Sequence, residues 1–116
     1  MFALIAVITL SPQMAYCSFE PGRGVIRNVM PATPDYEAGT KPWFKSAEAL
    51  IVNGETFARG GAPVKRLNVN FTAITYRDGV PILVKDAPRD EPDHVYVLIS
   101  SRNCLFQPYV RVQRNP

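Results

Sequence analysis

The chain has two cysteines, Cys17 and Cys104, and one histidine, His94, the pair of residue types from which a thiol nucleophile and its base could be built. A cysteine becomes a catalytic nucleophile when a base such as histidine lies within hydrogen-bond reach of its sulfur. His94 begins an apolar run that leads through the turn Ser-Ser-Arg-Asn to Cys104. If the flanking strands pair antiparallel about residues 101–103, His94 lies near Val110 and far from the Cys104 sulfur. The spacing therefore disfavours a Cys–His dyad.

Paired carboxylates are the second candidate chemistry, because glycoside hydrolysis needs two of them facing each other across a cleft. Glu48 and Glu55 flank a turn at Asn53-Gly54 and are placed to be neighbours. A chain of 116 residues buries only a modest core, which leaves little room for a sugar-binding cleft. A small hydrolase that uses Cys104 or this carboxylate pair stays open as an alternative function.

Metal binding needs clustered ligands, and the sequence does not supply an evident cluster. One histidine and two cysteines make a zinc site only if a carboxylate joins all three. The loop over residues 85–93 carries carboxylates on Asp86, Asp90, Glu91 and Asp93. Lys85 and Arg89 lie among them, and the alternating acidic pattern of a calcium loop is missing. We expect a solvated loop and predict neither a metal nor a cofactor.

The first seventeen residues predict a secretory leader. "MFALIAVITL" is almost wholly apolar, the next residues break the run, and no charged side chain precedes Glu20. Its apolar core of about nine residues is shorter than the roughly 20 that span a bilayer, which is typical of a signal peptide, although a basic n-region is missing. We expect export to the periplasm or cell envelope, with no stable membrane span once residues 1–17 are removed. A buried N-terminal strand or helix is the alternative.

The cleavage point decides what happens to Cys17. A cut after Ala15 keeps it, and a Cys17–Cys104 disulfide in an oxidising compartment would then tie the N-terminal segment to the last strand. A cut after Cys17, with Ala15 at position −3, removes it and leaves Cys104 as a small buried hydrophobe. The sequence leaves both outcomes open.

Two regions follow the leader. Residues 18–46 hold four prolines and show no sustained period, which predicts an extended Pro-rich arm that packs partly on the domain, with room for a short strand over 24–30. Residues 47–116 form the compact β domain, in which Asn53-Gly54 and Asp78-Gly79 predict hairpin turns. "HVYVLIS" is apolar on both faces and predicts a central strand, and "CLFQPYVRV" predicts the last strand.

Composition agrees with a mainly β fold, a small antiparallel barrel or roll of five to six short strands. Eleven prolines disfavour a helical bundle, because proline fixes φ and lacks a backbone donor. The net charge is +3, and the cations are spread along the chain. Nucleic-acid binding proteins usually gather their cations into a stripe, so we do not expect a nucleic-acid partner.

Two stretches, "VNGETFARGGAP" over residues 52–63 and "DGVPILV…DHVYVLISSRNCLFQPY" near the end of the chain, resemble a small domain of uncharacterised exported bacterial proteins. The resemblance covers about residues 48–112 and implies a compartment and a fold rather than an activity. The closing run is also similar to the last strands of SH3-like domains, where an aromatic residue and a Pro-Tyr pair contribute to a peptide groove. Phe106, Pro108 and Tyr109 match those positions, whereas the acidic loop and paired tryptophans of eukaryotic SH3 domains are missing.

Aromatic side chains with arginine at the rim are the main binding candidates, because these types dominate interface hot spots. The candidate surface consists of Trp43, Phe44, Phe106, Pro108, Tyr109 and Arg111. Core positions for Phe106 and Tyr96 are the alternative. We predict a non-enzymatic exported binding module that contacts a protein or a cell-wall polymer through this surface. A structural domain that docks by its arm or by a sheet edge is the second hypothesis.

Overall fold

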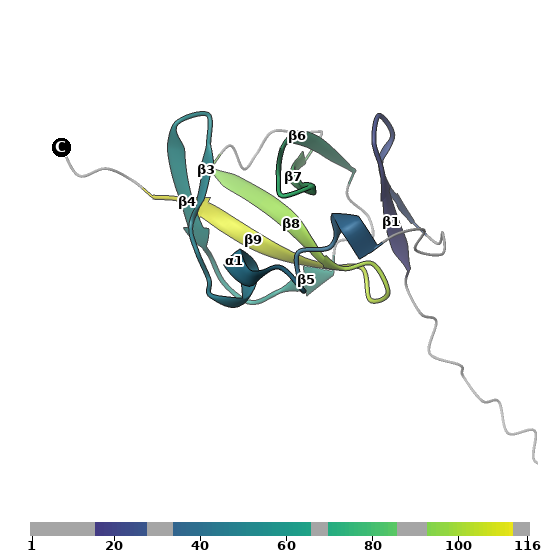
Figure 1. The fold of residues 1–116 in the computed structure, drawn as a ribbon. Coiled ribbons are helices and arrows are strands. Elements are labelled where there is room, and N and C mark those ends of the chain that lie inside the picture. The colour runs from purple at the N-terminus through teal and green to yellow at the C-terminus, as the bar shows by residue number, and fades with distance from the viewer. Residues whose placement is uncertain (1–15, 28–33, 66–69, 86–92, 113–116) are drawn as a thin grey trace, which may run out of the picture.

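The computed structural model describes residues 16–27, 34–65, 70–85 and 93–112 (Figure 1). Most of the predicted leader, residues 1–15, lies outside the described residues, as do Asp86, Asp90 and Glu91 of the predicted acidic loop. Within the described part, no helix is long and apolar enough to cross a membrane. In the same residues, no group of three or more His, Cys, Asp or Glu side chains is placed to hold a metal ion.

A strongly curled antiparallel sheet forms the body of the molecule (Figure 1). Its strands follow the order β3, β4, β9, β8, β7, β6. Their bounds are β3 Leu50–Val52, β4 Glu55–Arg59, β9 Leu105–Arg111, β8 His94–Ser100, β7 Val80–Lys85 and β6 Phe71–Arg77. A two-residue strand, β5 Val64–Lys65, pairs with β9 along the same edge as β4. The predicted mainly β, antiparallel fold is confirmed as a half-barrel, and the closer likeness to an SH3 domain stays a prediction.

The segment predicted as an extended arm holds regular structure of its own. It contains the antiparallel hairpin of β1 (Cys17–Glu20) and β2 (Gly24–Arg27), then the short helical turns η1 (Pro34–Tyr36) and α1 (Pro42–Lys45). Main-chain hydrogen bonds attach it to the sheet, because the amides of Cys17 and Ala38 donate to the carbonyls of Ser101 and Leu98. The segment is packed on the domain, and a leader boundary placed after Cys17 would cut through β1.

The two hairpin turns expected from the sequence are confirmed. β3 and β4 meet at Asn53-Gly54, and β6 and β7 meet at Asp78-Gly79. All four turn residues have positive φ, at 52° and 78° in the first turn and 49° and 83° in the second. A type I′ turn requires this conformation at both central positions, and Asn-Gly and Asp-Gly adopt it at low cost.

β8 is confirmed as a central strand, between β9 and β7. Val95 and Val97 are buried on one face of the sheet, and Tyr96 and Leu98 are buried on the other. The register of β8 with β9 sets His94 opposite Val110, as the spacing predicted. A strand that is apolar on both faces is stable only when both faces are shielded from water. Two hydrophobic cores, one on each face of the sheet, provide this.

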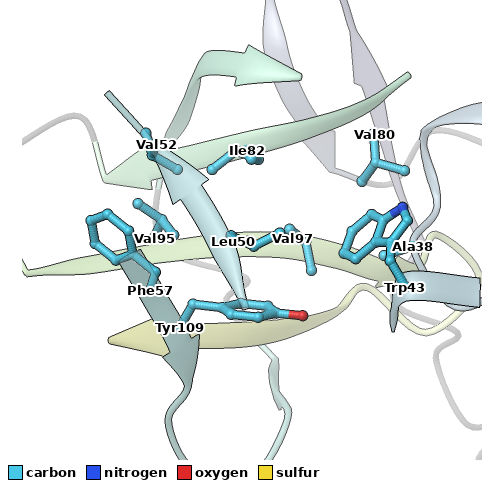
Figure 2. Packing of buried hydrophobic residues seen from close by; sticks show 10 residues of the cluster. All are labelled: Ala38, Trp43, Leu50, Val52, Phe57, Val80, Ile82, Val95, Val97 and Tyr109. Atoms are coloured by element: carbon cyan, nitrogen blue, oxygen red, sulfur yellow. The ribbon is translucent and has the colours of Figure 1, made fainter. Parts of the chain in front are cut away.

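The inner core fills the concave side of the sheet. Figure 2 shows Leu50 and Val97 near its centre, with Phe57 and Trp43 at opposite ends. Its members are Ala38, Trp43, Leu50, Val52, Phe57, Val80, Ile82, Val95, Val97 and Tyr109. The cluster joins side chains of β3, one end of the strand order, to side chains of β7, next to the other end, so the curl of the sheet brings them together.

The outer core lies on the opposite face, under the β1–β2 hairpin. Its members are Cys17, Phe19, Phe71, Leu83, Tyr96, Leu98, Cys104 and Phe106. A disulfide joins Cys17 to Cys104, across a sequence separation of 87 residues and with the Cα atoms 5.0 Å apart. Both cysteines are fully buried. The bridge therefore fastens the hairpin to the sheet next to the start of β9.

Arg77 ties the two ends of the strand order together. From the end of β6 its guanidinium donates to the carbonyl of Ala49 and to the carboxylate of Glu48, each at 3.0 Å. These two residues lie just before β3. The same guanidinium lies 4.9 Å from the ring centroid of Trp43. Arg77 thus closes the curl over the inner core.

Candidate functional site

Four of the six residues of the predicted aromatic surface lie in the interior. Trp43 and Tyr109 belong to the inner core, Phe106 belongs to the outer core, and Pro108 is also buried. These side chains present no aromatic face to solvent. The reason is that both faces of the curled sheet are covered, by α1 on one side and by the hairpin on the other. The core alternative considered for Phe106 and Tyr96 is what the structure shows.

The other two residues of that surface are engaged within the molecule. Phe44 is half-buried, and the guanidinium of Arg59 stacks over its ring at 4.0 Å and donates to its carbonyl. Arg111 donates to the carboxylate of Glu55 at 3.0 Å and forms an ion pair with Asp93. The hydrogen bond to Glu55, with the charge of Asp93, raises the pKa of Arg111. Arg111 therefore stays protonated, and the carboxylates of Glu55 and Asp93 already balance its positive charge.

The residues considered for catalysis are not brought together. The sulfur of Cys104 is bonded to Cys17, and His94 lies across from Val110 rather than beside that sulfur. The two carboxylates have separate partners, Arg77 for Glu48 and Arg111 for Glu55. The cross-strand partner of Glu55 is Val52, so the first hairpin does not set the two carboxylates opposite each other.

A groove of about 190 Å³ lies between the β1–β2 hairpin and the edge strand β6. The hairpin contributes Phe19, Arg23 and Gly24 to its lining, and β6 contributes Phe71, Thr72 and Tyr76. Two elements that are far apart in the sequence therefore form its walls. The disulfide and the burial of Phe19 hold the hairpin wall in place.

Tyr76 is the most accessible aromatic side chain of this groove, with 48% of its surface exposed. Among the described residues, no other aromatic side chain is so exposed. Its ring packs edge-on against Phe19, with 6.1 Å between the centroids, so its orientation is set. Arg23 lies at the rim with 71% of its side chain exposed, and its partner is the carboxylate of Glu20 at 3.1 Å. The groove thus combines a fixed aromatic ring with an accessible guanidinium.

Neither Tyr76 nor Arg23 was singled out from the sequence, although a signal existed for Tyr76. Alternation along "FTAITY" buries Phe71 and exposes Thr72, and the same count places Ile74 and Tyr76 on the exposed side. All three even-numbered side chains are exposed in the structure. Arg23 carried no comparable signal, because its place depends on the docking of the hairpin.

A second groove, of about 340 Å³, lies on the outer face of the sheet. Its lining includes Gly60, Gly61, Val64, His94, Tyr96 and Pro108. The rings of His94 and Tyr96 stack there at 6.5 Å. Tyr96 itself is almost fully buried, so this groove offers a shallow apolar floor and, apart from His94, no polar side chain that would select a ligand.

Comparisons of the chain with models of protein families, with curated proteins and with solved structures found no match.

Proposed function

We propose that the protein is an exported, non-enzymatic binding module whose contact site is the groove between the β1–β2 hairpin and β6. The observation that carries the proposal is that Tyr76 and Arg23 line the same groove, both exposed to solvent. Tyrosine and arginine are the side-chain types most enriched in binding hot spots. A rigid, half-exposed ring loses little entropy on binding, which makes Tyr76 the expected anchor.

Export is supported by the disulfide and by the apolar leader. Disulfides persist in oxidising compartments such as the bacterial periplasm. Cys17 is buried, bonded and part of β1, so a leader peptidase that served this fold would cut before Cys17, as a cut after Ala15 does. Mass spectrometry of the exported chain tests this. A mature chain that starts at Tyr16 agrees with the proposal, and one that starts at Ser18 contradicts it.

A binding role rather than catalysis is supported by what lines the groove. Its polar groups are a guanidinium, a threonine hydroxyl, a tyrosine hydroxyl and main-chain groups. Neither a carboxylate nor an imidazole belongs to this lining, and the Glu20 carboxylate at its rim is paired with Arg23.

The test compares variants of the disulfide-bonded protein immobilised on a matrix. We expect Tyr76→Ala to lower the retention of its envelope partners, proteins or cell-wall polymer, by at least about tenfold, and Arg23→Ala to lower it by less, because rim charges contribute less than buried anchors. Ile51→Ala is the matched control, since Ile51 is an exposed side chain on the opposite edge strand. Equal retention by wild type and Tyr76→Ala, at equal melting temperature, would overturn the proposal.

A further inference from the structure

In the part of the chain that the structure describes, the two strands at the ends of the sheet order differ in length. β3 and β6 are the terminal strands of the order. β3 has three residues, whereas β6 has seven. An edge strand presents unpaired N–H and C=O groups, and short edges are one of the ways in which natural sheets avoid pairing with another chain. By length alone, β6 is the edge that can accept a further strand.

Contacts at both ends of β6 define the stretch that is accessible. At its start Gly24 of the hairpin packs on the Phe71 carbonyl so closely that a Cβ on Gly24 would lie 2.5 Å from that oxygen. At its end Arg77 turns away to bind Ala49 and Glu48. Residues 73–76 lie between these contacts, and Ala73 and Tyr76 line the groove. Four residues of strand extend for about 13 Å, which is enough for a short added strand.

The side chains on this stretch suit strand pairing. Ile74 and Tyr76 are both exposed, and β-branched and aromatic residues are the types that pair well across strands. β6 carries neither a lysine nor a proline, the residues that commonly protect an edge. It does carry a bulge, the one protective device of this edge, because the register passes from Ala73 to Thr75 and leaves Ile74 without a cross-strand partner in β7.

We propose, on the basis of the binding function above, that the groove takes an extended polypeptide segment of a partner protein, which adds to the sheet beside β6. The main chain of the partner pairs with the edge groups of residues 73–76, and Tyr76 packs against one of its side chains. Arg23 favours a carboxylate on the partner, because its pair with Glu20 lies between exposed groups and is weak. An extended polypeptide is the occupant whose backbone can satisfy an edge strand.

The probe is a random heptapeptide library displayed on phage and selected on the oxidised full-length protein. A synthetic copy of an enriched peptide is then titrated into wild type and into Ile74→Pro. Proline is tolerated at bulges of edge strands but removes one N–H and blocks pairing there. We expect Ile74→Pro to lower the affinity at least tenfold and the bound peptide to slow hydrogen exchange at main-chain amides within residues 73–76. We also expect the enriched peptides to be acidic.

Ile74→Lys is the second variant, in case Ile74→Pro does not fold, and Ile51→Lys on β3 is the matched control that should bind as wild type does. A peptide that binds without slowing exchange at residues 73–76, or that ignores both Ile74 variants, would overturn strand addition. Soluble cell-wall oligosaccharides form the second arm. If they bind in a Tyr76-dependent way and no peptide is enriched, the groove is the site but its occupant is a glycan, and strand addition fails. If neither probe depends on Tyr76, the proposed function itself fails.

Discussion

Trp43 illustrates how the position of one side chain changes its expected role. It is the single tryptophan of the chain, and its residue type places it in the binding surface predicted from the sequence. In the structure it lies in the inner core, almost fully buried, under the guanidinium of Arg77. Removal of its side chain would leave a cavity among Ala38, Val80 and their neighbours (Figure 2). It would not remove a contact with a partner, because the indole does not lie on the surface.

We therefore expect Trp43→Ala to lower the free energy of unfolding by about 3–5 kcal/mol, the cost of a large aromatic cavity. Phe44→Ala is the adjacent control. Phe44 is only half-buried, so its removal should cost about 1–2 kcal/mol. Urea unfolding followed by circular dichroism measures both. In the wild type, the tryptophan emission should be blue-shifted and move to the red on unfolding. A Trp43→Ala variant as stable as wild type would show that the indole is not part of the core.

Among the elements, the β1–β2 hairpin depends on one close approach to β6. Gly24 has a φ of 81°, and its Cα faces the Phe71 carbonyl with no space for a side chain. Gly22, in the turn of the same hairpin, has a φ of 85°, but a Cβ added to it would meet nothing within 4 Å. The two glycines therefore share the conformational requirement and differ only in the contact.

This difference gives a matched pair of variants. Gly22→Ala should cost about 1 kcal/mol, because alanine is strained at positive φ. Gly24→Ala should cost about 1–3 kcal/mol more, because the added methyl group must push the hairpin away from β6. Hydrogen exchange of the β1–β2 amides together with urea unfolding measures the effect. Equal effects of the two substitutions would mean that the hairpin is not packed on β6 at Gly24.

The elements that could be predicted from the sequence are those that local chemistry specifies. Asn53-Gly54 and Asp78-Gly79 have a strong preference for type I′ turns, and both lie where expected. The run over β8 is apolar on both faces, which is sufficient to make it central. The place of His94 near Val110 followed from the short turn only to within one residue. The turn pairs Ser100 with Leu105, and a bulge between Leu98 and Ser100 then shifts the register so that His94 lies opposite Val110.

The elements that could not be predicted depend on tertiary contacts. β1, η1 and α1 are each three or four residues long, too short for a periodic signal, and prolines dominate their surroundings. β2 (Gly24–Arg27) lies within the short strand expected over 24–30, whereas its pairing with β1 had no signal in the sequence. Their position is set by the disulfide, by Phe19 and by main-chain bonds to the end of β8. The burial of Tyr109 and Trp43 depends on the curl of the sheet, which no single strand encodes. The candidate groove was missed for the same reason, since only docking of the hairpin creates it.

Taken as one unit, the protein has two cores that rely on the disulfide to different extents. The outer core contains both cysteines and is covered by the hairpin. The inner core contains neither, and is closed by Arg77, Trp43 and the first hairpin turn of the sheet. A bridge that spans 87 residues restricts the unfolded chain strongly, and its removal should cost roughly 4–5 kcal/mol.

The loss should be unequal between the two faces. We expect the double variant Cys17→Ala/Cys104→Ala to expose the hairpin amides to hydrogen exchange at urea concentrations where the emission of Trp43 is still that of the folded state. The hairpin forms one wall of the groove beside β6, so binding at the groove should fall in the same range. Wild type reduced with dithiothreitol after mild unfolding and refolding is the control for the two alanines. If the hairpin amides lose protection from exchange at the same urea concentration at which the Trp43 emission changes, the two cores unfold as one. The hairpin would then contribute to the cooperativity of the entire sheet rather than only form the wall of a site at its edge.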